Sequence, residues 1–146
     1  MRFSTLAFCL SLFLAVGCGR DVVTQQDAET DAKLSTKIEG YWQIKSVTFS
    51  SGKDHDVVTA EFRNFDKGTL TGLKSGDKAW GKEGGYAIKA GDIQFTNDDG
   101  TPRKKGTIDT LTDEKLVIQW LQPNGQPVVR GFLKTTYVKV KKETAK

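Results

Sequence analysis

The feature that most constrains this chain is an alternation of apolar and polar side chains with a period of two residues. It recurs in short segments from about residue 40 onward, for example in 92–97, where Ile93 and Phe95 alternate with Gln94 and Thr96. Successive side chains of a β-strand point to opposite faces of the sheet, so each such segment has one apolar and one polar face. No helical periodicity competes with this pattern between residues 40 and 140. The alternation therefore predicts an all-β domain.

Clusters of Gly, Asn, Asp and Pro separate these segments at regular intervals, and this spacing suggests an antiparallel sandwich or barrel. Strands that each have one apolar and one solvated face favour a closed sheet, so we expect a small up-and-down antiparallel β-barrel of about eight strands. The last strand is long enough to bend or divide near Gly131. The expected strands are 41–49, 57–65, 68–74, 84–90, 92–97, 105–111, 114–121 and 127–140.

The N-terminus has the organisation of a secretory signal. Arg2 precedes an apolar run from Leu6 to Val16, which is too short to span a bilayer as a helix. The small residues before Cys18 resemble the lipobox of bacterial lipoproteins. This resemblance implies a signal peptide over 1–17, acyl chains (such as palmitate) on Cys18, and a membrane anchor in a bacterial cell envelope. An ordinary signal peptide with a chance cysteine is the alternative.

Residues 18–39 are polar and contain no strand-like aromatic residue, so we expect a lipidated N-terminus and a flexible tether. Within them, 27–34 is the one stretch that favours a short helical turn. Gly19 after the cysteine favours the outer over the inner membrane if enterobacterial sorting rules apply. The domain proper is expected over 40–146. Its net charge of +5 is spread widely, so the cluster 103–105 is interpreted as a solvated face, and no nucleic-acid partner is expected.

The start of the domain resembles the lipocalin family. Gly40-x-Trp42 is similar to the Gly-x-Trp signature of lipocalins, and three later segments fit small bacterial lipocalin-like domains: 84–93, 106–118 and 137–140. The resemblance implies a lipocalin-like barrel with Trp42 as a plug of its closed end. It also implies that Arg130 corresponds to the arginine that covers this tryptophan.

The chain offers little that suggests catalysis. His55 is the only histidine; it lies between Asp54 and Asp56, where an exposed turn is a better interpretation than a metal site. If Cys9 leaves with the signal and Cys18 is lipidated, no free thiol remains for a nucleophilic site. We therefore expect no enzyme, no cofactor and no metal.

Aromatic residues are the candidates for ligand binding. Trp80 lies in a loop rich in Gly and charge, where it either covers the barrel mouth, meets a ligand or partner, or packs on the wall. In the expected strand 57–65, Val58, Ala60 and Phe62 share the apolar face. The interior of an eight-stranded barrel is either filled or holds one small ligand. The expected inward-facing aromatics are Phe62, Tyr86, Phe95 and Trp120.

Two functions from different classes are compatible with these features. The first is non-enzymatic binding of a small, hydrophobic ligand inside the barrel of a lipid-anchored envelope protein. The second is a protein-interaction or envelope-maintenance module with a filled barrel, which would contact another envelope protein through an outer patch around Trp80 or through its basic edge. A cavity of roughly 300 Å³ or more favours the first function, and a packed core favours the second.

Overall fold

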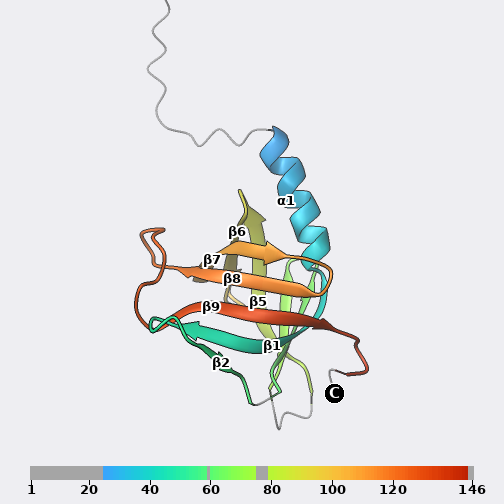
Figure 1. Cartoon of the computed structure of the whole chain (residues 1–146). Coiled ribbons are helices and arrows are strands. Elements are labelled where there is room, and N and C mark those ends of the chain that lie inside the picture. The colour runs from blue at the N-terminus through green and yellow to red at the C-terminus, as the bar shows by residue number, and fades with distance from the viewer. Residues whose placement is uncertain (1–24, 59, 75–78, 145–146) are drawn as a thin grey trace, which may run out of the picture.

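The computed structural model describes residues 25–58, 60–74 and 79–144, which form one helix and nine strands (Figure 1). The helix is α1 (Gln25–Ile38). The strands are β1 (Gly40–Phe49), β2 (Asp54–Asp56), β3 (Phe62–Asp66), β4 (Thr69–Leu73), β5 (Gly81–Lys89), β6 (Asp92–Thr96), β7 (Pro102–Leu111), β8 (Lys115–Leu121) and β9 (Phe132–Val140).

The strands form a closed barrel. From β3 to β9 each strand pairs antiparallel with the next, and β1 closes the sheet by pairing with both β3 and β9. The short strand β2 pairs only with the second half of β1, beyond the part that pairs with β3, so eight strands make the barrel wall. The predicted all-β, up-and-down antiparallel barrel is confirmed.

One strand prediction needs correction. The expected strand 57–65 begins only at Phe62, as β3, and the preceding strand β2 lies at Asp54–Asp56, where a loop was expected; β1 changes its partner between the two. Val58 lies between these strands and is 96% exposed, so it does not contribute to an apolar face. The last expected strand, 127–140, divides near Gly131, as expected: β9 begins only at Phe132, because Gly131 has a φ of 82° and breaks the extended backbone.

The short helical turn expected within 27–34 is part of a longer helix, α1, so residues 25–38 are not a flexible tether. An ion pair between Lys33 and Glu29, one helical turn apart at 2.6 Å, supports the helix. The carboxylate of Asp31 also fixes it to the barrel, because it accepts hydrogen bonds from the backbone N–H groups of Ala90 and Gly91 at 2.8 and 3.1 Å. These partners are about sixty residues away in sequence, so the local sequence pattern could not predict the contact.

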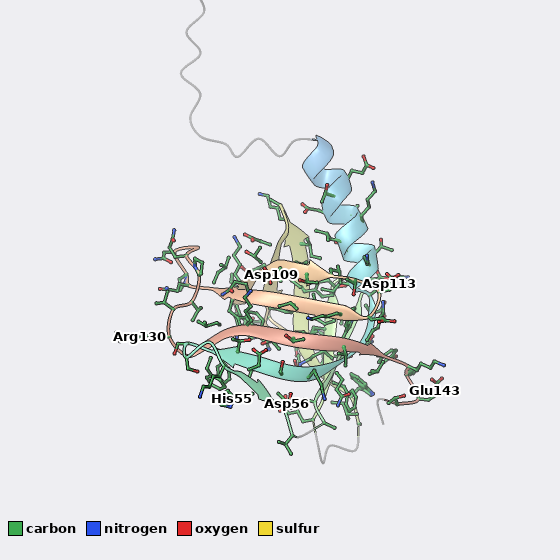
Figure 2. The ribbon with its side chains drawn as sticks, in the orientation of Figure 1. His55, Asp56, Asp109, Asp113, Arg130 and Glu143 are labelled. Carbon is green, nitrogen blue, oxygen red and sulfur yellow. The ribbon has the colours of Figure 1, made fainter. Side chains whose placement is uncertain are left out.

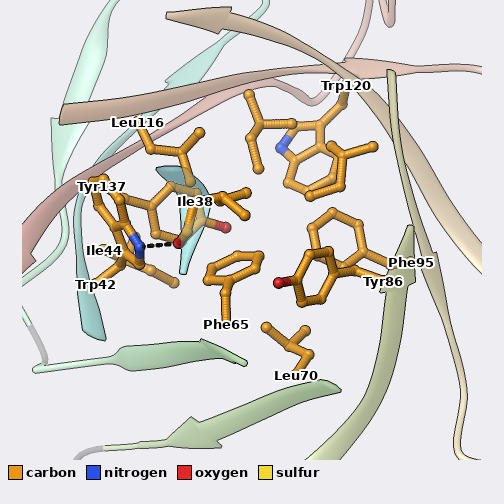
Figure 3. Packing of buried hydrophobic residues seen from close by; sticks show 12 residues of the cluster. Ile38, Trp42, Ile44, Phe65, Leu70, Tyr86, Phe95, Leu116, Trp120 and Tyr137 are labelled. Carbon is orange, nitrogen blue, oxygen red and sulfur yellow. Dashed lines mark hydrogen bonds between the residues drawn. The ribbon is translucent and has the colours of Figure 1, made fainter. Parts of the chain in front are cut away.

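The last turn of α1 closes one end of the barrel. Ile38 and Trp42 are fully buried there, and the indole N–H of Trp42 donates a hydrogen bond of 2.7 Å to the carbonyl of Ile38 (Figure 3). An ion pair between Lys37 and Asp113 joins the helix to the β7–β8 turn at the same end. The position of Trp42 as a buried plug is as expected.

Among the described residues, no helix is long and apolar enough to cross a membrane. The expected signal peptide and Cys18 lie outside the described residues.

Candidate functional site

A cavity of about 250 Å³ lies inside the barrel at the end opposite to α1. Phe132 marks this end, because it begins β9, whereas the other end of β9 pairs with β1 beside Trp42. Side chains from seven of the eight barrel strands contribute to the lining. They are Ile44, Val47, Arg63, Phe65, Leu70, Phe95, Arg103, Lys104, Trp120, Phe132, Thr135 and Tyr137.

The inner part of the cavity is aromatic. The rings of Phe65 and Tyr137 lie edge to face with centroids 6.5 Å apart, and those of Phe95 and Trp120 are 5.8 Å apart. The indole N–H of Trp120 donates to the hydroxyl of Thr135 at 2.8 Å, so this polar atom does not need a ligand as partner. Burial raises the pKa of Tyr137 to about 12, and the nearby Arg63 opposes this rise. The inner surface of the cavity is therefore uncharged at physiological pH and largely aromatic.

Arg63 lies at the mouth of the cavity with its charge already balanced. Its Nε lies 2.8 Å from a carboxylate oxygen of Glu83, and a terminal nitrogen lies 3.6 Å from Glu61. A β-bulge in the pairing of β4 with β5 places Glu83 there, and Gly72 makes room for it, since a Cβ at that position would collide with the Glu83 carboxylate. The ion pair between Arg63 and Glu83 links β3 to β5 at this side of the mouth.

Arg103 and Lys104 lie on another side of the mouth. The Nζ of Lys104 is 3.5 Å from the centroid of the Trp120 ring, a cation–π arrangement, and Arg103 donates to the carbonyl of Glu83 at 3.3 Å. Although much of the Lys104 residue is exposed, its ammonium is partly removed from water, and this burial, together with the charge of Arg103, lowers the pKa of Lys104. In the described part of the chain, no carboxylate lies within 4 Å of the charged nitrogens of either residue.

The structure separates the five aromatic residues predicted to bind a ligand. Phe95 and Trp120 line the cavity. Tyr86 is buried in the core, with its ring 5.1 Å from that of Phe65, but it does not line the cavity. Phe62 and Trp80 are on the outside of the barrel. The prediction that Phe62 faces the interior is wrong, and of the alternatives for Trp80 the structure shows packing on the wall.

Phe62 points outward because β3 has the opposite register to the one expected. Phe65 lines the cavity, and residues three apart in a strand point to opposite faces. Phe62 instead packs with Leu73 in a cluster on the outer wall, together with Trp80, Tyr41 and Val140. The ring of Trp80 lies edge to face with that of Tyr41 at 5.4 Å, so its loop covers the wall, as in the wall-packing alternative.

The expected role of Arg130 is also wrong. Arg130 is exposed in the loop before β9, on the opposite side of the barrel from Asp113 (Figure 2). Trp42 instead lies at the closed end, beside the end of β9 and the last turn of α1. Lys139, which pairs with Trp42 across β1 and β9, lies over the indole ring instead, with its ammonium 5.0 Å from the centroid. Gly40, by contrast, begins β1 with a φ of 122°, which favours glycine.

His55 is exposed, as expected, but lies in β2 rather than in a turn (Figure 2). Its ring packs edge to face on Phe49, with centroids 4.9 Å apart. Within residues 25–58, 60–74 and 79–144, no group of three or more His, Cys, Asp or Glu side chains is arranged to hold a metal ion.

The sequence interpretation missed the cations of the mouth. The expected register of 57–65 put Phe62 on the apolar face, which sends its neighbour Arg63 to the polar one. The cluster 103–105 was interpreted as a solvated face, and its three residues are exposed, but this interpretation did not place Arg103 and Lys104 at the mouth of the cavity. A β-bulge explains the second miss: Phe95 pairs with Lys104, but the adjacent Thr96 pairs with Pro102, so two consecutive residues, Arg103 and Lys104, both reach the cavity. Strict alternation cannot reveal such a pair.

Both the sequence and the fold of this chain are similar to those of lipocalin-like proteins. The family model described as a lipocalin-like domain matches residues 38–118. A lipocalin-like protein from Bacteroides uniformis is 16% identical, and the match covers 70% of this chain and 97% of that one with a TM-score of 0.50. An uncharacterized protein from Bacteroides eggerthii is 18% identical over 70% of this chain and 99% of that one, also with a TM-score of 0.50. These identities show a shared fold alone, and no curated protein matches the chain.

Proposed function

Because this chain belongs to the lipocalin-like domain family, we propose that it is a non-enzymatic binding protein that takes a small, largely apolar molecule into the open end of its barrel. Fold alone is a weak warrant for function, so the proposal depends on the site. The observation that supports it is the cavity of about 250 Å³ lined by aromatic and aliphatic side chains. Its volume is below the roughly 300 Å³ that favours ligand binding over a filled barrel, so a binding experiment decides between the two functions.

The size of the cavity limits the ligand. Ligand pockets commonly have volumes of about 300–1,000 Å³, so this cavity lies just below that range. At about 30 Å³ for each water-sized or methylene-sized group, 250 Å³ holds roughly eight such groups. The proposed ligand is therefore a compact molecule or the end of a longer one, and a complete long-chain lipid would not fit inside.

Native mass spectrometry of the chain purified from its own host tests this proposal. We expect the folded protein to carry a small molecule that is released on unfolding, and to bind compact apolar probes saturably with a change in tryptophan emission. The variant Phe95→Trp, which enlarges a side chain in the cavity lining, should reduce this binding. An empty protein that binds no such probe would contradict the proposal and favour the interaction module.

We also propose that acyl chains on Cys18 attach the protein to the bacterial cell envelope, at the outer membrane. The motif around Cys18 supports this, and several acyl chains together anchor a protein stably. Metabolic labelling with an alkyne analogue of palmitate, followed by membrane fractionation, should label the wild-type chain in the outer membrane. Labelling that persists in Cys18→Ser would contradict the assigned site, and recovery in the inner membrane would contradict the assigned membrane.

A further inference from the structure

The charges at the mouth of the cavity are not balanced. Three cationic residues and no acidic residue belong to the lining. Arg63 has Glu83 and Glu61 as ion partners, whereas no described carboxylate pairs with Arg103 or Lys104. Two cations without an acidic partner therefore lie at the entrance to an otherwise apolar space.

The position of Lys104 has an energetic cost that a ligand can offset. Its ammonium lies on the face of Trp120 and is partly buried, which disfavours the charged form. The electron-rich face of the indole compensates part of this cost. An anion placed between Lys104 and Arg103 would compensate more of it, because charge-assisted hydrogen bonds to a carboxylate are stronger than contacts with a neutral group.

A second hollow continues from these two residues. A groove of about 380 Å³ runs along the outside of β7. Arg103 and Lys104 are the two residues that line both this groove and the internal cavity. The third cation of the groove, Lys105, is already paired with Asp92 at 2.7 Å. The positive charge left without a partner is thus concentrated where the apolar cavity meets the solvated groove.

From this arrangement we infer that the ligand is an anionic amphiphile. Its acidic head group lies at the rim between Arg103 and Lys104, and its apolar body lies inside the barrel against Trp120 and Phe95. This inference rests on the proposed binding function and adds the chemical class of the ligand. Neutral molecules with the same apolar body lack the charge-assisted contact with Arg103 and Lys104. Cationic molecules are repelled by these two residues.

The β-bulge in β7 argues against an incidental cluster of surface lysines. Bulges re-aim side chains, and they are frequent beside functional sites. Without the irregularity at Phe95 and Thr96, strict alternation would send Arg103 and Lys104 to opposite faces of the barrel wall. The bulge instead brings both charges to the mouth.

Titration of the full chain with three eight-carbon probes tests the inference. Octanoate, octanol and octylamine share the apolar body and differ in the charge of the head group. Calorimetry and tryptophan emission would follow binding, with the same titration into protein-free buffer as the blank. We expect octanoate to bind about 10- to 100-fold more tightly than octanol, as for one or two hydrogen bonds between charged groups, and octylamine to bind most weakly.

Substitutions of the two cations test where the head group of the ligand binds. Lys104→Met and Arg103→Met keep an apolar stem and remove the charge, so each should weaken octanoate about tenfold and leave octanol unchanged. Lys104→Arg should keep the preference for octanoate. The matched control is Lys115→Met, which removes an exposed charge from the same strand as Trp120, at the closed end. It should change neither affinity.

The outcomes separate the two proposals. Equal binding of octanoate and octanol, unchanged by the variants at 103 and 104, would overturn the anionic ligand and leave the apolar binding function intact. Binding of none of the three probes by the wild-type chain would count against both. If a Met variant loses its native circular dichroism, Arg103→Gln and Lys104→Gln replace it in the same comparison.

Discussion

The two ends of the barrel differ in how their buried groups are partnered. At the closed end, Ile38 and Trp42 are completely buried and the one polar atom of the indole has a hydrogen-bond partner. At the open end, Phe132 is 51% exposed and Arg103 has no acidic partner within the described residues. The closed end therefore has what stability requires, whereas the open end keeps apolar surface and charge that are accessible to a further molecule. Such local departures from stable packing are typical of functional sites.

Trp42→Ala should have the largest effect on stability, because it removes the packing of the closed end. The substitution removes the largest fully buried side chain and leaves a cavity at the closed end, so we expect a loss of about 3–5 kcal/mol in the free energy of unfolding. Urea unfolding measures it. Trp80→Ala is the matched control, because Trp80 is only partly buried on the outer wall and should cost less. A loss below about 1 kcal/mol for Trp42→Ala would contradict the role of this residue as a plug.

High pH should destabilise the barrel through Tyr137, which is buried at the inner wall of the cavity. Its pKa is about 12 in the folded state, mainly because of burial, against about 10 in the unfolded chain. Below pH 10 the hydroxyl is neutral in both states. Between pH 10 and 12 only the unfolded chain loses the proton, so unfolding becomes more favourable by about 2–3 kcal/mol.

Urea unfolding between pH 9 and 12 measures this effect, and Tyr137→Phe should remove most of it. Burial also raises the pKa of Tyr86, so a smaller decline should remain in the variant. Identical pH profiles of the wild type and Tyr137→Phe would show that Tyr137 ionises in both states alike.

Asp31→Ala should weaken the attachment of α1 to the closed end. It removes both hydrogen bonds to the β5–β6 turn, and we expect a loss of about 1–2 kcal/mol and faster hydrogen exchange in residues 29–36. Glu29→Ala is the control, because it removes only an exposed ion pair, worth about 0.3–0.5 kcal/mol. Octanoate binding at the far end should be unchanged in both variants. Unchanged exchange in Asp31→Ala would mean that other contacts hold the helix.

The same comparison explains what the sequence could predict. The barrel follows from a local pattern, the alternation within each strand, and the plug follows from the resemblance of the Gly-x-Trp start of β1 to lipocalins. The direction in which Phe62 points does not, because β1 exchanges β2 for β3 as its partner and the chain between them is irregular. The docking of α1 depends on Asp31 meeting a turn about sixty residues away.

The candidate site was harder to predict than the fold, for the same physical reason. Phe95 and Trp120 were found because regular alternation places them inside. Arg103 and Lys104 reach the mouth through a β-bulge, and Glu83 reaches Arg63 through another bulge beside Gly72. A bulge adds one residue to one strand only, so it reverses the predicted faces without any local sign in the apolar pattern.

Ala90→Gly should have the smallest effect on the free energy of unfolding, and it tests whether the turn that holds α1 at the closed end is strained. Ala90 has a φ of 51°, a left-handed conformation that glycine adopts more easily than alanine. In this conformation the turn directs the N–H groups of Ala90 and Gly91 toward Asp31. The backbone strain at Ala90 therefore accompanies the attachment of the helix. The relief of roughly 1–2 kcal/mol is partly offset by the greater flexibility of glycine in the unfolded chain, which leaves a gain of about 0.5 kcal/mol. Urea unfolding of Ala90→Gly, alone and combined with Asp31→Ala, measures it; a loss of stability in the single variant would contradict a strained turn.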